Sequence, residues 1–209
     1  MKKLAIKLAG AAILALSSMG SALAQSEPIV FVHGYSGSNS NWDTMMARFR
    51  ASGYQGRLYG FEYASLIASN STSGSQLRTF VNNVRAANGY QPVSIIAHSN
   101  GGLVSRYFRV NGGGTSVMRR FVSLGSPHSG TTSAYACVSP ACFDMRPYSL
   151  FLIQLAGRGC DRSLWSAVDG VILPATSAMC GNSTQVASVG HLSLLTDSSV
   201  YNSVRAALR

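Results

Sequence analysis

Residues Ile95-Ile96-Ala97-His98-Ser99-Asn100-Gly101-Gly102 (IIAHSNGG) lie near the middle of the chain and decide its fold class. An apolar run ends at a serine, and two glycines follow before an amphipathic stretch begins. Such a run is typical of a strand buried on both faces of a parallel sheet, and the glycines permit a sharp turn. The stretch therefore predicts a strand, a tight turn at Ser99 and a helix that packs back on the sheet.

The rest of the chain repeats this alternation of apolar runs and helix-like segments. Expected strands span residues 28–33, 57–63, 92–97, 117–124, 162–168 and 184–189, and expected helical stripes span 40–51, 77–84, 103–108 and 197–208. The segment 125–159 is expected to be irregular. This alternation is typical of a mostly parallel sheet with helices on both faces. We expect a six-stranded α/β domain whose functional residues lie on loops at the carboxyl ends of the strands.

The N-terminal segment 1–24 has the three parts of a secretory signal peptide. A start with three lysines precedes the apolar stretch 8–16, and Ala22-Leu23-Ala24 matches a small-x-small cleavage site. A retained membrane anchor is the alternative, but the apolar stretch is shorter than the ~20 residues that a bilayer span needs. We expect cleavage after Ala24, a secreted product (extracellular or periplasmic) without a stable membrane anchor, and a single domain over residues 25–209.

The charge pattern argues against a nucleic-acid partner. The chain has 17 basic and 7 acidic residues, and its lysines all lie in the expected signal peptide, so every later basic residue is an arginine. The arginines are spread from Arg48 to Arg209, with Arg119-Arg120 as the only adjacent pair. Because no basic stripe with interleaved aromatics occurs, we expect no nucleic-acid binding and at most a mild attraction to anionic lipid surfaces.

Four cysteines follow the expected signal peptide: Cys137, Cys142, Cys160 and Cys180. In an oxidising compartment an even number usually forms disulfides. Of the three possible pairings, Cys137–Cys142 with Cys160–Cys180 is favoured, because each pair is nearest in sequence and closes a loop-like region. A zinc site is the alternative, but no CxxC spacing occurs. We expect no metal.

Ser99 has the surroundings of a catalytic nucleophile. A serine that stands clear of a sheet on a strand-to-helix turn needs small residues two before and two after it. Here these are Ala97 and Gly101, which gives the A-x-S-x-G variant of the nucleophile elbow. The short motif alone also fits an ordinary glycine turn. The strand before it and the helix after it favour the elbow.

A nucleophilic serine needs an adjacent base that a carboxylate orients. Of the four histidines, His191 follows the last expected strand and lies on the functional edge, so it is the candidate base. His98 should point away from the serine beside it, and His33 is expected to make structural hydrogen bonds. His128 lies on the same edge but in a turn-rich stretch.

Asp169 is the candidate carboxylate, because it follows the expected strand 162–168 in an Asp-Gly turn. Asp-Gly is also an ordinary turn pair. Asp161 begins that strand and so falls at the wrong end of the sheet. Asp144, in the irregular segment, is the second choice, and Asp197 is expected to cap the final helix.

The oxyanion of a tetrahedral intermediate needs about two N–H donors. The backbone amide of Asn100, directly after the serine at the helix start, is one candidate. The second is the amide of Tyr35, in the loop His33-Gly34-Tyr35-Ser36-Gly37 after the first strand. An ordinary strand-ending glycine turn is the alternative for this loop.

Five segments together resemble the small secreted bacterial lipases of the class 2 group, within the α/β-hydrolase superfamily. They are VFVHGYSGSNSNW (30–42), IIAHSNGG (95–102), VSLGSPHSGT (122–131), AVDGVI (167–172) and VGHLSLL (189–195). The resemblance runs from about Ile29 to Leu208. It implies Ser99 as nucleophile, Asp169 as acid and His191 as base, in the chain order of the superfamily. It likewise implies oxyanion donors at Tyr35 and Asn100.

The resemblance also implies what the protein does: triacylglycerol hydrolysis through an acyl-enzyme, without cofactor, on a minimal fold with little or no lid. The partner would be a lipid or other ester at an interface; no particular oligomeric state is predicted. A short-chain esterase, thioesterase or acyltransferase on the same triad is the alternative, and a non-catalytic secreted binding module is a remote one.

The segment 126–160 departs from the minimal pattern of these lipases. It is expected to form either a short flap over the site or a surface loop stapled by a disulfide. A Cys160–Cys180 disulfide would bracket Asp169 and hold the loop that carries this carboxylate.

Overall fold

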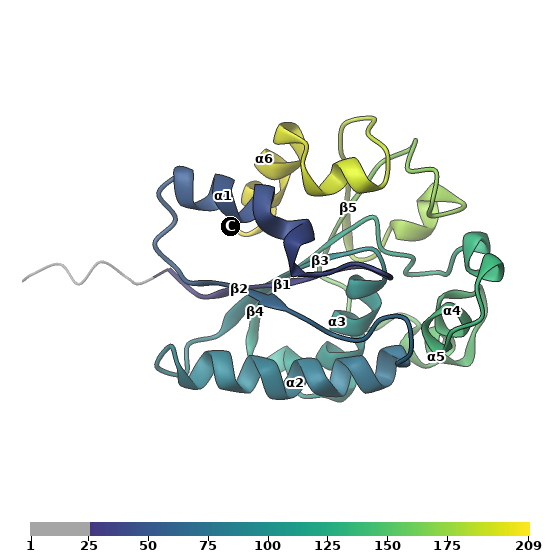
Figure 1. Cartoon of the computed structure of the whole chain (residues 1–209), viewed down its shortest axis with the longest axis horizontal. Helices are drawn as coiled ribbons and strands as arrows, with labels where there is room; N and C mark the ends of the chain where they lie inside the picture. Colours follow the sequence, from purple (N-terminus) through teal and green to yellow (C-terminus); the bar gives the residue numbers. More distant parts are fainter. Residues whose placement is uncertain (1–25) are drawn as a thin grey trace, which may run out of the picture.

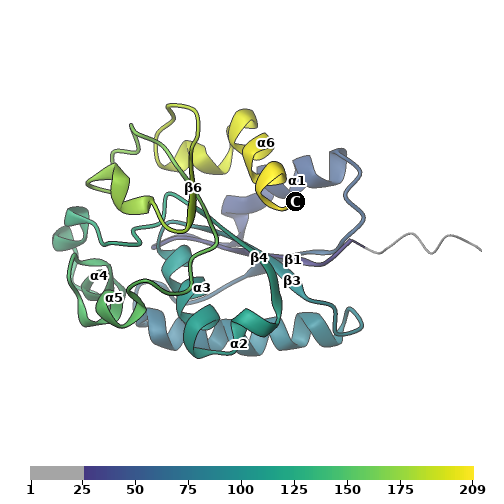
Figure 2. The same cartoon turned by 180° about the vertical axis from the view of Figure 1, so that it is seen from behind.

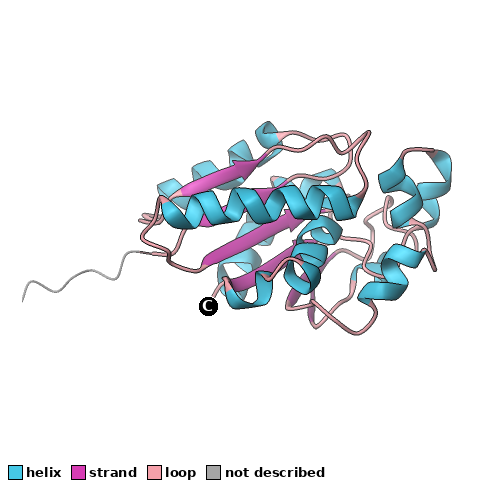
Figure 3. Cartoon of the chain, turned by 90° about the horizontal axis from the view of Figure 1, so that it is seen from below, coloured by secondary structure: helices cyan, strands magenta, loops and turns pink. Residues whose placement is uncertain are grey.

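A single parallel sheet organises residues 26–209, which are the residues that the computed structural model describes. The expected signal peptide, residues 1–24, lies outside them. The strands are β1 (Ile29–Val32), β2 (Leu58–Phe61), β3 (Val93–His98), β4 (Met118–Leu124), β5 (Arg162–Trp165) and β6 (Asn182–Gln185). They pair in the order β2-β1-β3-β4-β5-β6, and every neighbouring pair is parallel (Figure 3). The expected six-stranded α/β fold is confirmed, with a sheet that is parallel throughout.

Helices cover both faces of the sheet (Figure 1). On one face lie α1 (Asp43–Ala51) and α6 (Ser198–Ala207), and on the other lie α2 (Asn70–Ala86) and α3 (Asn100–Asn111). Strand residues alternate between the two layers because successive side chains point to opposite faces. Phe31 packs with the α1 and α6 side chains, whereas Val30 and Val32 pack with those of α2 and α3. The same two layers are seen from behind in Figure 2.

The expectation that segment 125–159 is irregular is wrong. It contains a 3-10 helix (Thr132–Ala136) and two short helices, α4 (Pro140–Met145) and α5 (Leu150–Leu155). The hydroxyl groups of Ser139 and Ser149 cap α4 and α5 by accepting backbone N–H bonds. Helices of six residues are too short to show a 3.6-residue period, which is why the sequence pattern did not reveal them. They lie beyond the carboxyl ends of the strands and pack on α3 through Leu103 (Figure 1).

Other element boundaries differ from the expected ones. α2 begins at Asn70, seven residues before the first residue of its apolar stripe, because its first turns are polar and Ser69 caps them. β5 ends at Trp165 and β6 spans Asn182–Gln185, so both strands end earlier than expected. His191 consequently follows an irregular loop and not the end of a strand.

Both cysteine pairs are joined in the structure as the sequence favoured, Cys137 with Cys142 and Cys160 with Cys180. The first disulfide ties Cys137, directly after the 3-10 helix, to Cys142 within α4, and the second ties the start of β5 to the start of β6. Within residues 26–209, no helix combines the length and the apolar composition needed to cross a bilayer.

Candidate active site

Ser99 occupies a strained turn between β3 and α3. Its backbone has φ +54° and ψ −130°, a conformation that a non-glycine residue rarely adopts. The amide of Ser99 donates to the carbonyl oxygen of Leu124 at 2.9 Å, which fixes the turn to β4. The side chain lines a cavity of about 480 Å³ at the carboxyl edge of the sheet. This is the placement that an elbow serine requires.

The residue two after Ser99 is required to be glycine by close packing. A Cβ added at Gly101 would meet the carbonyl oxygens of Val32 and His33. α3 therefore starts directly against the end of β1. Ala97, two before the serine, is fully buried in the layer under α2 and α3. The glycine of the motif is explained by the close approach of α3 to the end of β1.

His191 and Asp169 form a buried pair. The Nδ1 atom of His191 lies 2.8 Å from Oδ2 of Asp169, and both side chains are less than one-tenth exposed. Oδ1 of Asp169 accepts the amides of Ile172 at 2.8 Å and Val171 at 3.0 Å. Burial alone would raise the pKa of Asp169, but hydrogen bonds from His191, Ile172 and Val171 outweigh it and lower the pKa. The carboxylate is therefore ionised at neutral pH and can orient an imidazole.

The absence of a side chain at Gly125 leaves room for the Asp169–His191 pair. Its φ is +51°, and an added Cβ would lie 2.8 Å from Oδ2 of Asp169 and 3.3 Å from Nδ1 of His191. A side chain at this position would push directly into the carboxylate–imidazole contact. Ser99 and His191 line the same cavity, and Asp169 reaches it through His191.

The two amides considered for the oxyanion lie on adjoining elements. Tyr35 follows β1 and lines the cavity beside Ser99, and Asn100 is the first residue of α3. Within residues 26–209, neither amide donates a backbone hydrogen bond, so both are available to a ligand. The Asn100 side-chain amide donates to the Tyr63 hydroxyl at 3.5 Å, and that hydroxyl donates to the carbonyl of His33 at 2.9 Å. The sequence pattern did not reveal this Tyr63 bridge.

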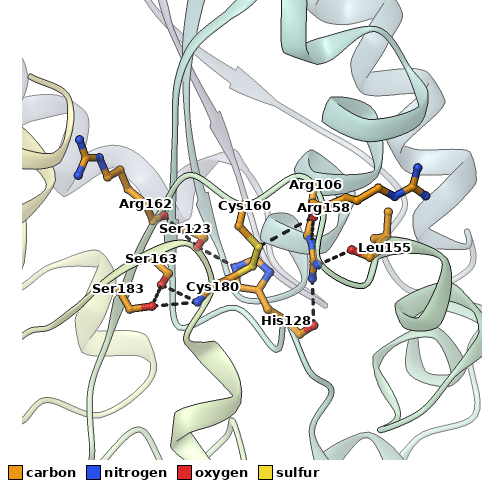
Figure 4. The surroundings of a disulfide bond; sticks show 10 residues. All are labelled: Arg106, Ser123, His128, Leu155, Arg158, Cys160, Arg162, Ser163, Cys180 and Ser183. Atoms are coloured by element: carbon orange, nitrogen blue, oxygen red, sulfur yellow. Dashed lines mark hydrogen bonds between the residues drawn. A yellow bond between two sulfur atoms is a disulfide. The ribbon is translucent and has the colours of Figure 1, made fainter.

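Two of the other histidines have structural partners. Nε2 of His33 lies 3.0 Å from the carboxylate of Glu62, and its ring stacks on Tyr63. Nε2 of His128 lies 2.8 Å from Oγ of Ser123, and burial together with Arg106 lowers the pKa of His128 to about 3 (Figure 4). Nε2 of His98 lies 3.1 Å from the carbonyl oxygen of His191.

The alternative carboxylates lie elsewhere. Asp161 accepts the amide of Phe121 at 2.9 Å and lies 3.4 Å from Nη1 of Arg109. Asp144 accepts the amide of Asn70 at 2.7 Å, at the start of α2. Asp197 caps α6 as expected, by accepting from two amides of its first turn. None of the three is among the residues that line the cavity with Ser99.

The segment 126–160 forms one wall of the cavity. Its contribution consists of Thr131, Ser133, Ala134, Cys137 and Met145. Val171, Ile172 and Leu192, from the loops that carry Asp169 and His191, also line the cavity, and the Val171 carbonyl accepts from the Thr131 hydroxyl at 2.9 Å. No Asp, Glu, Lys or Arg of residues 26–209 is among the lining residues, and the lining is mostly apolar. No cluster of three metal-ligating side chains occurs in the same residue range.

Comparison with known proteins places these features in a family. The family model described as "Lipase (class 2)" matches residues 26–204. A triacylglycerol lipase of Burkholderia plantarii is 30% identical over 142 residues, which cover 61% of this chain and 38% of that protein. A triacylglycerol lipase of Pseudarthrobacter phenanthrenivorans is 30% identical over 116 residues, covering 51% of this chain and 35% of that protein. The chain thus spans little more than a third of the length of these relatives.

Among solved structures, the mature form of Bacillus licheniformis lipase BlEst2 superimposes with a TM-score of 0.74. The alignment covers 88% of this chain and 93% of that chain, at 18% sequence identity. At this level of sequence identity the similarity shows the fold alone, which is the α/β-hydrolase fold.

Proposed function

Because this chain belongs to the class 2 lipase family, we propose that it is a secreted carboxylic ester hydrolase that cleaves triacylglycerols with a Ser-His-Asp triad. The observation that carries this proposal is the pairing of His191 with Asp169 at 2.8 Å, in the cavity that Ser99 also lines. Serine on a strained elbow, an imidazole and an ionised carboxylate are the groups that acyl transfer requires.

The proposed reaction has two halves. Oγ of Ser99 attacks the ester carbonyl carbon while Nε2 of His191 takes its proton, and Asp169 stabilises the resulting imidazolium through Nδ1. The amides of Tyr35 and Asn100 donate to the carbonyl oxygen as it becomes an oxyanion. The ester C–O bond then breaks, and His191 protonates the departing alcohol.

In the second half, water attacks the acyl-enzyme. His191 takes one proton from the water, and a second tetrahedral oxyanion forms in front of the same two amides. When it collapses, the bond from the acyl carbon to Oγ of Ser99 breaks, and His191 returns the proton to Ser99. The products are a carboxylic acid and the free enzyme.

The character of the cavity supports a neutral ester substrate. Its walls carry no Asp, Glu, Lys or Arg within residues 26–209, so a charged acyl chain would lose hydration without gaining a partner. Leu192, which lines the cavity, is 71% exposed, and Val138, next to the lining residue Cys137, is 82% exposed. Secretion through cleavage after Ala24 is part of the proposal, and it agrees with two disulfides.

The decisive experiment replaces the nucleophile. Ser99→Ala should abolish hydrolysis of tributyrin emulsion and of p-nitrophenyl butyrate, and it should prevent labelling by an active-site phosphonate. The matched control is Ser75→Ala, on the exposed face of α2, which should behave as the wild type. Activity retained by Ser99→Ala with an unchanged circular dichroism spectrum would refute the assignment.

The same assay separates the possible acceptors and substrates. A lipase hydrolyses the emulsion faster than soluble esters, whereas an esterase prefers the soluble ester. If a phosphonate labels the protein but the protein hydrolyses neither oxygen esters nor thioesters, the protein is an acyltransferase whose acceptor is missing from the assay.

A further inference from the structure

His98 lies directly before Ser99, and its side chain contacts the backbone of His191. Its Nε2 atom lies 3.1 Å from the carbonyl oxygen of His191, and its ring centroid lies 4.5 Å from that of His191. The residue is 3% exposed. Because a carbonyl oxygen can only accept, Nε2 of His98 must carry the proton and donate it.

The protonation state of His98 suits this role. Burial, and then the nearby His191, lower the pKa of His98 to about 3. The ring is therefore neutral at neutral pH and holds a single proton, which the carbonyl fixes on Nε2. The ionisable groups that face it are His191 and Asp169.

His191 needs an external support because it lies on an irregular loop. Its amide donates to the carbonyl of Asp169 at 3.1 Å, and its Nδ1 lies 2.8 Å from the Asp169 carboxylate. Both of these contacts come from one loop, after β5. Its carbonyl accepts a long bond of 3.4 Å from Leu194, within the same turn. The bond from His98 is the contact that comes from the strand carrying the nucleophile.

His98 also borders the loop that carries Tyr35. A Cβ added at Gly34 would lie 3.3 Å from Nδ1 of His98 and 2.9 Å from Cβ of Ser99. One ring thus contacts the oxyanion loop on one side and the base on the other. A shift of His98 would change the distance between nucleophile and base, on which general-base catalysis depends.

We propose that His98 is a positioning residue, which holds the backbone of His191 to the nucleophile strand through the Nε2–carbonyl hydrogen bond. This inference rests on the proposed roles of Ser99 and His191. It assigns no contact with the substrate to His98.

Two variants separate the hydrogen bond from the volume of the ring. His98→Gln keeps an amide N–H at about the reach of Nε2, and His98→Leu fills much of the space without a donor. His98→Leu should lower kcat on p-nitrophenyl butyrate on the order of 10²-fold, since small displacements of reacting groups cost about that much. KM should change much less than kcat, because the proposed role of His98 is to hold His191 and not to bind the ester. His98→Gln should restore most of kcat.

A spectroscopic readout tests the contact without turnover. The hydrogen-bonded Nδ1 proton of His191 gives a low-field proton NMR resonance, which should be present in the wild type and in His98→Gln. In His98→Leu it should broaden or shift, because the freed loop loosens the bond to Asp169. The matched control is His128→Leu, which removes another buried histidine and should leave kcat and this resonance unchanged.

The outcomes are distinct. If His98→Leu keeps the wild-type kcat and resonance, His98 does not position the base. If His98→Gln and His98→Leu lose kcat equally, the ring matters for packing and not for its N–H, and the proposal is also wrong. If the wild type hydrolyses no ester, the proposed function fails, while the resonance still decides whether His98 holds His191.

Discussion

Asp169 and His191 are joined twice, because the carboxylate Oδ2 lies 2.8 Å from the imidazole Nδ1 and the Asp169 carbonyl accepts the His191 amide at 3.1 Å. The second bond fixes the backbone from which the imidazole extends. The other carboxylate oxygen is committed to the amides of Val171 and Ile172. The carboxylate can therefore turn only one oxygen towards the His191 imidazole.

This arrangement predicts a large effect of Asp169→Asn. The new side-chain oxygen would keep the two backbone N–H bonds, so its NH₂ group would face Nδ1 of His191. Nδ1 would then have to accept, its proton would move to Nε2, and the imidazole could not act as a base. We expect kcat to fall on the order of 10³- to 10⁴-fold, as when a triad histidine is held in the wrong tautomer.

The measurement is kcat on p-nitrophenyl butyrate, with a melting curve to verify folding. Asp161→Asn, which alters the Arg109 contact at the other end of β5, is the control and should change kcat little. If kcat of Asp169→Asn falls less than tenfold while its melting curve matches that of the wild type, another group orients His191.

Gly125→Ala should disturb the contact between Asp169 and His191 by steric overlap. The substitution combines a positive φ with a Cβ only 2.8 Å from the Asp169 carboxylate. We expect a loss of about 1–3 kcal/mol in the free energy of unfolding and a lower kcat. Gly53→Ala separates the two causes, because Gly53 has φ +78° with nothing within 4 Å of an added Cβ. It should cost about 1 kcal/mol from backbone strain alone and leave kcat unchanged. Equal kcat values in the two variants would contradict the prediction.

Stability should decrease as the pH falls below about 6.5. His98 and His128 have folded-state pKa values lowered to about 3 from 6.5, so between these values the unfolded chain binds more protons than the native state. The lowered pKa of Asp169 also makes the protein less stable as the pH falls below the ordinary pKa of an aspartate. The raised pKa of Asp144 has the opposite effect on stability. The free energy of unfolding should therefore be higher at pH 7.5 than at pH 4.5.

Urea titrations at these two pH values, with and without His128→Gln, give the check. The variant alters the contact between His128 and Ser123, so it should be less stable than the wild type at pH 7.5. It also lacks one titrating group, so its free energy of unfolding should fall less between pH 7.5 and pH 4.5. Parallel curves for the two proteins would show that His128 protonates as readily in the folded as in the unfolded state.

The parts of the site that follow strand ends could be predicted from sequence. Ser99 after β3 and the amide of Tyr35 after β1 are placed by apolar runs and the turns that follow them, and parallel strands bring those turns to one edge. The short helices α4 and α5 could not be predicted, because six residues show no period. The bond from His98 to the carbonyl of His191 joins residues 93 positions apart, and no local pattern encodes it.

Arg106 makes long-range hydrogen bonds that no local sequence pattern reveals. These bonds hold the segment that forms one wall of the cavity. From α3 it donates to the carbonyls of Arg158 at 2.8 Å, His128 at 3.0 Å and Leu155 at 2.6 Å (Figure 4). These carbonyls all belong to the segment 126–160. Burial lowers the pKa of Arg106 to about 10, so the guanidinium remains charged at neutral pH.

Arg106→Met should therefore remove the guanidinium donor from three carbonyls, of which that of Leu155 keeps the Arg158 amide at 3.0 Å. We expect a loss of about 3 kcal/mol or more in the free energy of unfolding, since hydrogen bonds to a charged group contribute about 1.5–3 kcal/mol each. Arg109→Met is the matched control on the same helix, where a partly exposed ion pair with Asp161 contributes about 1 kcal/mol or less. Urea titration of both variants measures the difference. Because Arg106 holds the segment that supplies Ala134 and Met145 to the cavity, its loss should also raise KM, whereas Arg109→Met should not. If the two variants were equally stable, the three carbonyl bonds would not anchor this segment.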